Sequence, residues 1–178
     1  MRRKVWLDPA RIGEIRRKVK ILLRSVGYSA PPTKLESIAN FLGISIKYAP
    51  YSEGELAGML LFHPEPIIAI NSAHHKNRQR FTIAHEIGHF LLHENEDVHI
   101  DERMIVLYRD EHSSLAINEK EVEANQFAAE LLMPRGVLLN DLESMPLDVE
   151  EDRQVTELAK KYGVSQQAMA FRIANILS

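Results

Sequence analysis

Residues 77–93 read NRQRFTIAHEIGHFLLH, and this stretch decides the fold. Apolar and small side chains return in it every three or four residues; they are Phe81, Ala84, Ile87, Gly88, Leu91 and Leu92. This period is typical of an amphipathic helix that packs through one face. We therefore predict a helix over residues 77–93.

The centre of this helix carries His85-Glu86-Ile87-Gly88-His89, an H-E-x-x-H motif in the helical context that it requires. The two histidines are one turn, or about 6 Å, apart along the axis, so both imidazoles can bind one tetrahedral metal ion. Glu86 points about 100° away from His85, which places its carboxylate beside the water that the metal would activate. The motif predicts His85 and His89 as zinc ligands and Glu86 as the catalytic general base of peptide-bond hydrolysis.

Two histidines on an amphipathic helix can also simply border the core, because so short a pattern arises by chance. Their placement favours a metal. His85 and His89 continue a semi-buried stripe from Phe81, where polar groups need partners, and Gly88 leaves room for a neighbour or a substrate. His93 lies about 12 Å along the axis from His85, too far for both to bind the same ion. We expect His93 beside the site or at the surface.

The third metal ligand comes from outside this helix. The metzincin continuation of the motif is missing, because Leu92 stands where its glycine would be and Asn95 where its histidine would be. The chain has no cysteine, so a carboxylate is expected. Many acids follow the motif, among them Glu94, Glu96, Asp97, Asp101, Glu102, Asp110, Glu111, Glu119, Glu121 and Glu123.

Helical phase narrows this choice within a helix predicted over residues 118–133. One face, expected to meet solvent, collects Glu119, Glu123, Gln126 and Glu130. Glu121 points the opposite way, with Ala124, Asn125, Ala128, Leu131 and Leu132. A lone carboxylate on a buried face costs several kcal/mol unless it is paired or binds a metal, so Glu121 is the best candidate ligand. Ala124 and Ala128 allow close packing on the histidine helix, and Asn125 either orients a ligand or is an ordinary packing amide.

The rest of the chain predicts short strands followed by helices. Strands are expected over residues 44–48, 56–62 and 67–70, and further helices over 8–27, 31–43, 152–162 and 165–177, with weaker helical signals up to 144. This order predicts an α+β fold, in which a small, mostly antiparallel three-stranded sheet is packed by helices and the C-terminal part is helical. We expect a single domain over residues 1–178.

Composition is that of an ordinary globular protein, with 45% hydrophobic and 26% charged residues. No apolar run approaches the roughly 18 residues that span a bilayer, and no secretory stretch forms before Asp8, so no membrane partner is expected. The absence of cysteine excludes disulfides and fits a reducing, cytoplasmic location.

The net charge of −3 hides a basic N-terminus. Nine of the first 24 residues are Lys or Arg: Arg2, Arg3, Lys4, Arg11, Arg16, Arg17, Lys18, Lys20 and Arg24. Such a segment can contact nucleic acid or an acidic partner. An apolar helical stripe runs through it, which favours a surface helix with a solvated basic face.

Residues 155–173 have the spacing of a DNA-binding helix-turn-helix, in which Gln166, Gln167 and Arg172 would face a groove. Few cations support this, and six acids precede it that would repel DNA: Asp141, Glu143, Asp148, Glu150, Glu151 and Asp152. We therefore expect no direct nucleic-acid binding, and interpret residues 152–178 as a helical pair that completes the core.

Two runs resemble the ImmA/IrrE family of zinc metallopeptidases. One is residues 77–93, and the other is residues 121–134, which read EVEANQFAAELLMP against a family pattern of E-x-x-A-N-x-F-A followed by L-L-M-P. The resemblance extends from about Pro32 to the end of the chain and leaves residues 1–30 outside it. It implies a zincin-like active-site helix, with one zinc ion per chain bound by His85, His89 and Glu121.

The resemblance also implies that Glu86 is the catalytic base and that the substrate is a regulatory protein, commonly a helix-turn-helix repressor. The alternative is a DNA-binding or protein-binding regulator, such as a toxin-antitoxin or prophage component, with a non-catalytic metal site. We expect the substrate backbone to lie along an exposed strand over residues 56–62. Six side chains are eligible to stabilise the oxyanion, and spacing does not rank them: Tyr51, His63, His74, His75, Tyr108 and His112.

Overall fold

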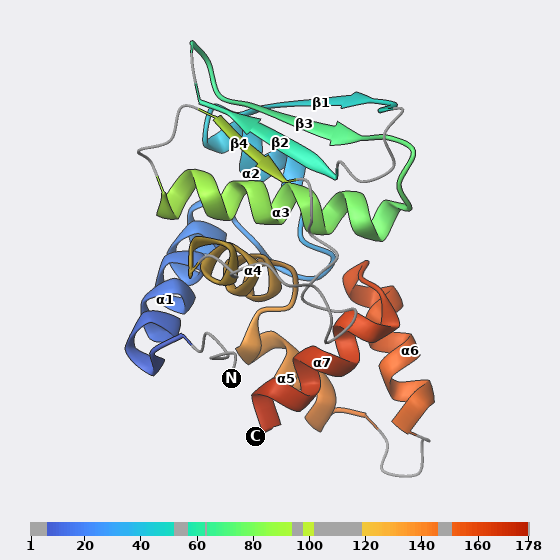
Figure 1. The fold of residues 1–178 in the computed structure, drawn as a ribbon. Helices are drawn as coiled ribbons and strands as arrows, with labels where there is room; N and C mark the ends of the chain where they lie inside the picture. The colour runs from blue at the N-terminus through green and yellow to red at the C-terminus, as the bar shows by residue number, and fades with distance from the viewer. Residues whose placement is uncertain are drawn as a thin grey trace, which may run out of the picture.

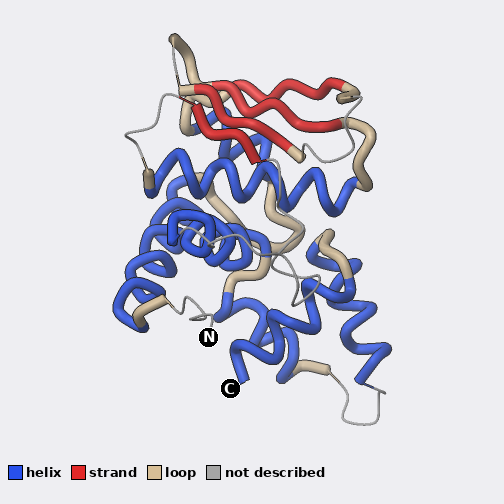
Figure 2. The backbone as a smooth tube through the Cα atoms, viewed as in Figure 1, coloured by secondary structure: helices blue, strands red, loops and turns tan. Residues whose placement is uncertain are grey.

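The computed structural model describes residues 7–51, 57–62, 64–93, 98–101, 119–145 and 151–177. Within these residues, seven helices and a four-stranded sheet form layers. The sheet lies on one side of the long helix α3 (Lys76–Leu92), and α1, α4 and the C-terminal helices lie on the other (Figures 1 and 2). The predicted α+β class with a helical C-terminal part is confirmed.

The first two helices begin and end close to the predicted positions. At the start of α1 (Pro9–Ser25), the side chain of Asp8 accepts a hydrogen bond from the backbone N–H of Ala10 at 3.0 Å. The shorter α2 (Leu35–Phe41) ends before Gly43, whose φ of 73° lies in the left-handed region that glycine adopts most easily. Both helices direct apolar side chains into the core.

The three predicted strands form as β1 (Ser45–Ala49), β2 (Gly58–Leu61) and β3 (Ile67–Asn71). A fourth strand, β4 (Val98–Asp101), completes the order β1-β3-β2-β4. β1 is parallel to β3, whereas β2 is antiparallel to both β3 and β4. The sheet is therefore mostly antiparallel, as predicted. The extra strand comes from a charged stretch that has no clear two-residue periodicity.

Strand β2 lies inside the sheet. Its Met59 is in register with Ala69 of β3 on one side and with Ile100 of β4 on the other. A strand that is paired on both sides has no free backbone groups for a substrate. The expectation that residues 56–62 present an exposed strand is therefore wrong for β2, because β4 covers the edge that β2 would otherwise offer.

Helix α3 runs through the centre of the molecule, and all of residues 82–89 are buried. The sheet approaches closely at Gly58, where an added Cβ would lie 2.4 Å from Cγ2 of Thr82. Helix α4 (Glu119–Leu132) approaches closely at Gly88, where an added Cβ would lie 3.2 Å from Cα of Ala124. A larger residue at either position would force its neighbours to move, and the small residues predicted to allow close helix packing do so.

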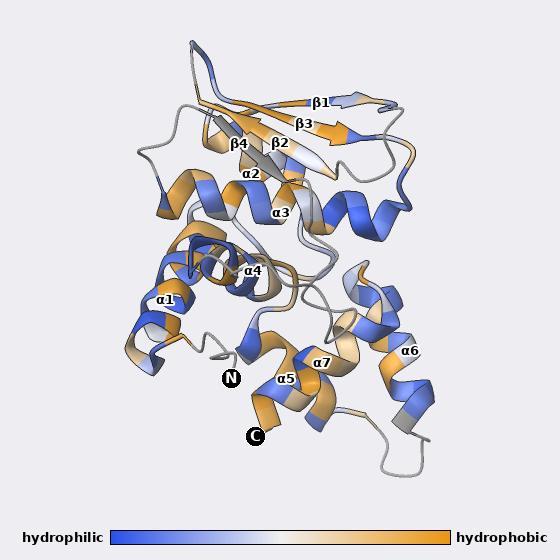
Figure 3. Ribbon diagram, viewed as in Figure 1, coloured by the Kyte–Doolittle hydropathy of each residue, from blue (hydrophilic) through white to orange (hydrophobic). Residues whose placement is uncertain are grey.

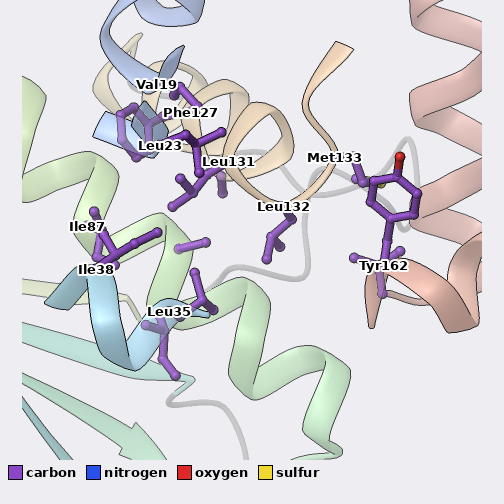
Figure 4. Close-up of a cluster of buried hydrophobic side chains, with 14 of the residues drawn as sticks. Val19, Leu23, Leu35, Ile38, Ile87, Phe127, Leu131, Leu132, Met133 and Tyr162 are labelled. Atoms are coloured by element: carbon purple, nitrogen blue, oxygen red, sulfur yellow. The ribbon is translucent and has the colours of Figure 1, made fainter. Parts of the chain in front are cut away.

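The main apolar core joins the first four helices to strands β2 and β3 and to the C-terminal helices, and Figure 4 shows part of it. It includes Val19 and Leu23 of α1, Leu35 and Ile38 of α2, Ile87 of α3, and Phe127 and Leu131 of α4. The hydropathy colouring shows that β3 is largely hydrophobic, while the first turns of α3 are hydrophilic (Figure 3). Burial of these side chains fixes α3 between the sheet and α4.

The C-terminal helices are α5 (Arg135–Glu143), α6 (Glu151–Tyr162) and α7 (Gln166–Leu177). The turn between α6 and α7 is tied to the first turns of α3. Asn77 Nδ2 donates to the carbonyl of Val164 at 2.9 Å, and Arg80 Nε donates to that of Gly163 at 3.1 Å. Arg172 is buried and donates to the Met133 carbonyl, so it does not face outward as a groove-reading residue would.

Most of the polar face of α4 is covered: Glu119 is exposed as predicted, whereas the predicted exposure of Glu123 and Glu130 is wrong. Arg11 of α1 donates to both carboxylate oxygens of Glu123, from Nε at 2.7 Å and from Nη2 at 2.5 Å. Arg172 of α7 pairs with the buried carboxylate of Glu130, which also accepts a hydrogen bond from the backbone N–H of Arg135 at 3.0 Å. The basic side of α1 is therefore only partly solvated, because some of its arginines contact α4.

Across the parts of the chain that the structure describes, no helix combines the length and the apolar character that crossing a bilayer requires.

Candidate metal centre

The two motif histidines lie on the face of α3 that meets α4. Both are fully buried, with side chains no more than 1% exposed. Their Nε2 atoms are 3.0 Å apart and their ring centroids are 4.6 Å apart. The ring of Phe81 stacks on His85 at a centroid distance of 6.4 Å. The stripe predicted from helical spacing is therefore present, and it directs both imidazoles to one point.

Glu121, in the first turns of α4, completes this cluster. Its Oε2 lies 3.3 Å from Nε2 of His85, and its Oε1 lies 3.3 Å from Nε2 of His89. Among the described residues, His85, His89 and Glu121 form the one group of three His, Cys, Asp or Glu side chains that could hold a metal ion. The acid selected by helical phase is the acid that the fold brings to the histidines.

The spacing of these atoms fits a tetrahedral metal ion. Atoms bound to one zinc ion at about 2.0–2.1 Å stand about 3.3 Å from one another. The two Nε2 atoms are 3.0 Å apart, and each lies 3.3 Å from one oxygen of the Glu121 carboxylate, Oε2 for His85 and Oε1 for His89. Two imidazoles and one carboxylate also leave one position open, as catalytic zinc sites do.

Asn125 fixes which nitrogen of His85 faces the cluster. Its Nδ2 donates to the Glu121 carbonyl at 2.7 Å, which directs its Oδ1 toward Nδ1 of His85 at 3.2 Å. Because a carbonyl oxygen only accepts, Nδ1 carries the proton in this contact and Nε2 of a neutral ring keeps its lone pair. Of the two interpretations of Asn125, the geometry agrees with the orienting one.

The charge state of Glu121 suits a metal ligand. Burial by itself would raise the pKa of the Glu121 carboxyl. Hydrogen bonds and charge interactions with His85 and His89 outweigh this effect and hold the pKa well below its usual range. The carboxylate is therefore ionised at neutral pH, which metal binding requires.

Glu86 is buried on α3 beside the cluster, with 0% of its surface exposed. It does not belong to the group of converging metal-ligating atoms. This placement agrees with a general base that acts near the metal without binding it. Its catalytic role, like the identity of the three ligands, stays a prediction.

His93 lies next to the cluster and outside it, as expected. Its ring centroid is 5.3 Å from that of His89, and its Nε2 is 3.2 Å from the Lys120 carbonyl. Of the six candidates for oxyanion stabilisation, His63, Tyr108 and His112 lie outside the described residues. His75 caps the start of α3, which is about 15 Å along the axis from His85. The structure does not bring His75 to the cluster.

Sequence reasoning missed Arg11 as a neighbour of the site. Arg11 reaches Glu123, two residues after Glu121, from a position 112 residues away in the chain. The sequence did contain one signal: the basic helix near the N-terminus is complementary in charge to the acidic face of residues 118–133. Helical phase alone could not pair the two surfaces.

Comparisons with known proteins show the family of this chain. Residues 39–174 match the peptidase family described as IrrE N-terminal-like domain. Two similar curated proteins are both named radiation response metalloprotease IrrE. The protein from Deinococcus radiodurans is 34% identical over 137 residues, which are 76% of this chain and 38% of that protein. The protein from Deinococcus deserti is 30% identical over 169 residues, which are 93% of this chain and 56% of that protein.

A solved structure, of a Mycobacterium tuberculosis transcriptional regulator, shares the fold. It matches 90% of this chain and 47% of that chain with a TM-score of 0.59, at 14% sequence identity. This chain thus spans about half or less of two of the three proteins, and 56% of the third. The family match covers most of the chain and includes both motif helices, and the resemblance to ImmA/IrrE peptidases is confirmed. The chain belongs to the IrrE N-terminal-like family of metallopeptidase domains.

Proposed function

We propose that this chain is a zinc-dependent peptidase domain that binds one zinc ion through His85, His89 and Glu121 and uses Glu86 as its general base. The observation that carries this proposal is the convergence of two buried imidazole nitrogens and one carboxylate within 3.0–3.3 Å. The proposal rests on the donor set and on the family, whose curated members include proteins named metalloproteases.

A bound zinc ion would lower the pKa of a water molecule to about 7 and polarise the carbonyl of the scissile bond. Glu86 takes the proton of the attacking water and returns a proton to the leaving amine. His85 is held in the required tautomer by Asn125 at 3.2 Å. The buried position of Glu86 excludes bulk water and so strengthens its interaction with the reacting groups.

The substrate that we propose is an extended segment of a regulatory protein, of the helix-turn-helix repressor type. This choice is supported by the resemblance of both motifs to ImmA/IrrE peptidases. Within the described residues, β4 is paired only with β2, so its other edge can accept an extended chain. We also propose a cytoplasmic location, where such a repressor would be met, from the cysteine-free sequence.

The test separates metal binding from chemistry. Glu86→Gln keeps the size of the side chain but cannot accept a proton, so the variant should bind zinc as the parent does and lose hydrolysis. The loss should be about 100-fold or more. Purified protein and variant are incubated with repressors encoded beside the gene, and cleavage is followed by mass spectrometry with and without a chelator.

Equal cleavage by the Glu86→Gln variant, unaffected by chelator, would exclude the peptidase proposal. Zinc binding without cleavage of any repressor, combined with tight binding of a regulator, would instead support the alternative of a regulator with a non-catalytic metal site. In that alternative Glu86→Gln and parent behave alike in every measurement.

A further inference from the structure

Helix α1 lies outside the residues that match the family, yet it reaches the neighbourhood of the proposed metal site. The family match begins at residue 39, whereas α1 ends at Ser25. Arg11 of α1 donates to both oxygens of Glu123, at 2.7 and 2.5 Å. Such a bidentate pair fixes direction as well as distance. The Glu123 side chain is largely buried in this contact.

From Glu123 the contacts continue through His93 to His89, a histidine of the H-E-x-x-H motif. Oε2 of Glu123 is 3.7 Å from Nε2 of His93. The same nitrogen of His93 lies 3.2 Å from the Lys120 carbonyl, and the His93 ring tilts against that of His89 at 5.3 Å. One connected set of side chains therefore runs from Arg11 to His89.

The contacts also hold the part of α4 that carries Glu121. Glu121 lies between Lys120 and Glu123 on α4. Arg11 contacts α4 at Glu123, two residues beyond Glu121, and His93 contacts it at the Lys120 carbonyl, one residue before Glu121. Together they fix this part of α4 against α3 and α1.

We propose that Arg11 is a positioning residue of the metal site: through Glu123 and His93 it holds Glu121 and His89 at the separation that one metal ion requires. The inference rests on the proposed metal site and deepens it. It assigns α1 a part in metal binding that the sequence, which pointed to a solvated basic face, did not suggest. The side-chain contacts of Arg11 are to Glu123 and Glu14, so its effect on the metal ligands is indirect.

The test is metal affinity, measured with Zn²⁺ in competition with a chromophoric chelator. Partners that orient metal ligands contribute 10- to 100-fold to affinity, and Arg11 acts through one further contact, so Arg11→Gln should weaken binding about three- to tenfold. Arg11→Lys should restore only part of the loss, because an ammonium cannot form the bidentate pair. The visible absorption of the Co²⁺-loaded protein should also change in Arg11→Gln.

The matched control is Arg16→Gln, which also removes an ion pair between α1 and α4. Arg16 Nε lies 3.7 Å from Oε2 of Glu130, seven residues beyond Glu123 and so about two turns further along α4. Loosening of α1 in general would affect both variants, whereas positioning through Glu123 affects only Arg11. Arg16→Gln should therefore keep the metal affinity and the Co²⁺ spectrum of the parent.

Glu123→Gln removes the same Arg11–Glu123 ion pair by changing the acid instead of the arginine. It should weaken Zn²⁺ binding as Arg11→Gln does, and the double variant should lose little more than either single variant, because both changes remove one interaction. Urea unfolding of the metal-free proteins confirms that each variant is folded. If Arg11→Gln cannot be obtained folded, Glu123→Gln against Arg16→Gln gives the same comparison.

The outcomes separate this inference from the proposed function. Unchanged affinity in Arg11→Gln and Glu123→Gln, with normal binding by the parent, overturns the positioning role alone. Equal losses in Arg11→Gln and Arg16→Gln overturn it too, because they show a general loosening. A parent protein that binds no Zn²⁺ overturns both proposals.

Discussion

The two faces of α4 carry carboxylates that are satisfied in different ways. On the face toward α1 and α7, Glu123 and Glu130 are paired with the guanidinium groups of Arg11 and Arg172. On the face toward α3, Glu121 meets two imidazoles. A guanidinium is always charged and offers only donors, so its pairs are complete without a further ligand.

Imidazoles behave differently, because a neutral ring presents a lone pair. His85 and His89 can therefore share a cation with Glu121, which the arginine pairs cannot do. The lesson is that the type of partner, more than the burial of the acid, separates a carboxylate that stabilises the fold from one that can bind a metal. Each prediction below tests that separation.

The largest effect is expected for Glu121→Gln. The variant keeps the shape of the side chain but loses the anionic ligand, so Zn²⁺ affinity should fall by about three orders of magnitude. Chelator competition and metal analysis of the purified protein measure this. Glu119→Gln, an exposed acid at the start of the same helix, is the control and should keep full zinc. Full zinc in Glu121→Gln would move the third ligand elsewhere.

Glu130→Ala should lower the stability of the fold and leave zinc binding unchanged. It leaves Arg172, which is 4% exposed, without its buried carboxylate. Breaking a buried pair in this way costs about 3–5 kcal/mol in the free energy of unfolding. Urea denaturation followed by circular dichroism gives this value. Folded Glu130→Ala should still bind one zinc ion, and loss of zinc without loss of stability would contradict the division between the two faces.

Gly88→Val tests the close approach of α3 and α4. An added Cβ at Gly88 would lie 3.2 Å from both Cα and the carbonyl oxygen of Ala124, so the branched side chain must push the helices apart. We expect a loss of about 1–3 kcal/mol in stability, together with weaker zinc binding as Glu121 moves from the histidines. Gly13→Val, where nothing lies within 4 Å of an added Cβ, should keep or slightly gain stability, because valine has a higher helix propensity than glycine.

The smallest effect is expected for Arg153→Gln on α6. Arg153 forms an ion pair with Glu157 at 3.1 Å, but both side chains are more than half exposed. Such surface pairs contribute about 0.3–0.5 kcal/mol on a helix. Thermal unfolding should therefore barely change. A large shift in the unfolding temperature would show that this exposed arginine pair contributes as much to stability as the buried ones, against the comparison made above.

The sequence predicted the parts of the site that depend on local period. Because α3 and α4 are regular helices, helical phase predicted that His85 and His89 share one face of α3 and that Glu121 lies on the buried face of α4. Strand β4 was not predicted, because its stretch is charged and shows no clear alternation. That strand also decides which edge of the sheet is free, and so the predicted substrate strand was wrong.

Ion pairs between residues far apart in the chain could not be predicted from the sequence either. Phase separated the polar face of α4 from its apolar face, but it could not show that arginines from α1 and α7 would cover the polar face. Glu123 and Arg11 are 112 positions apart, and Glu130 and Arg172 are 42 apart. Nothing in the local pattern of either helix specifies these partners.

The complete burial of residues 82–89 of α3 has a consequence for how metal enters and leaves. We expect the backbone amides of such a segment to be among the slowest in the domain to exchange with deuterium, so His85 and His89 should hold their positions. The side chain of Glu121 is 32% exposed, whereas both histidines are buried. We therefore expect the metal to be captured and released on the side of Glu121, while the histidines stay in place.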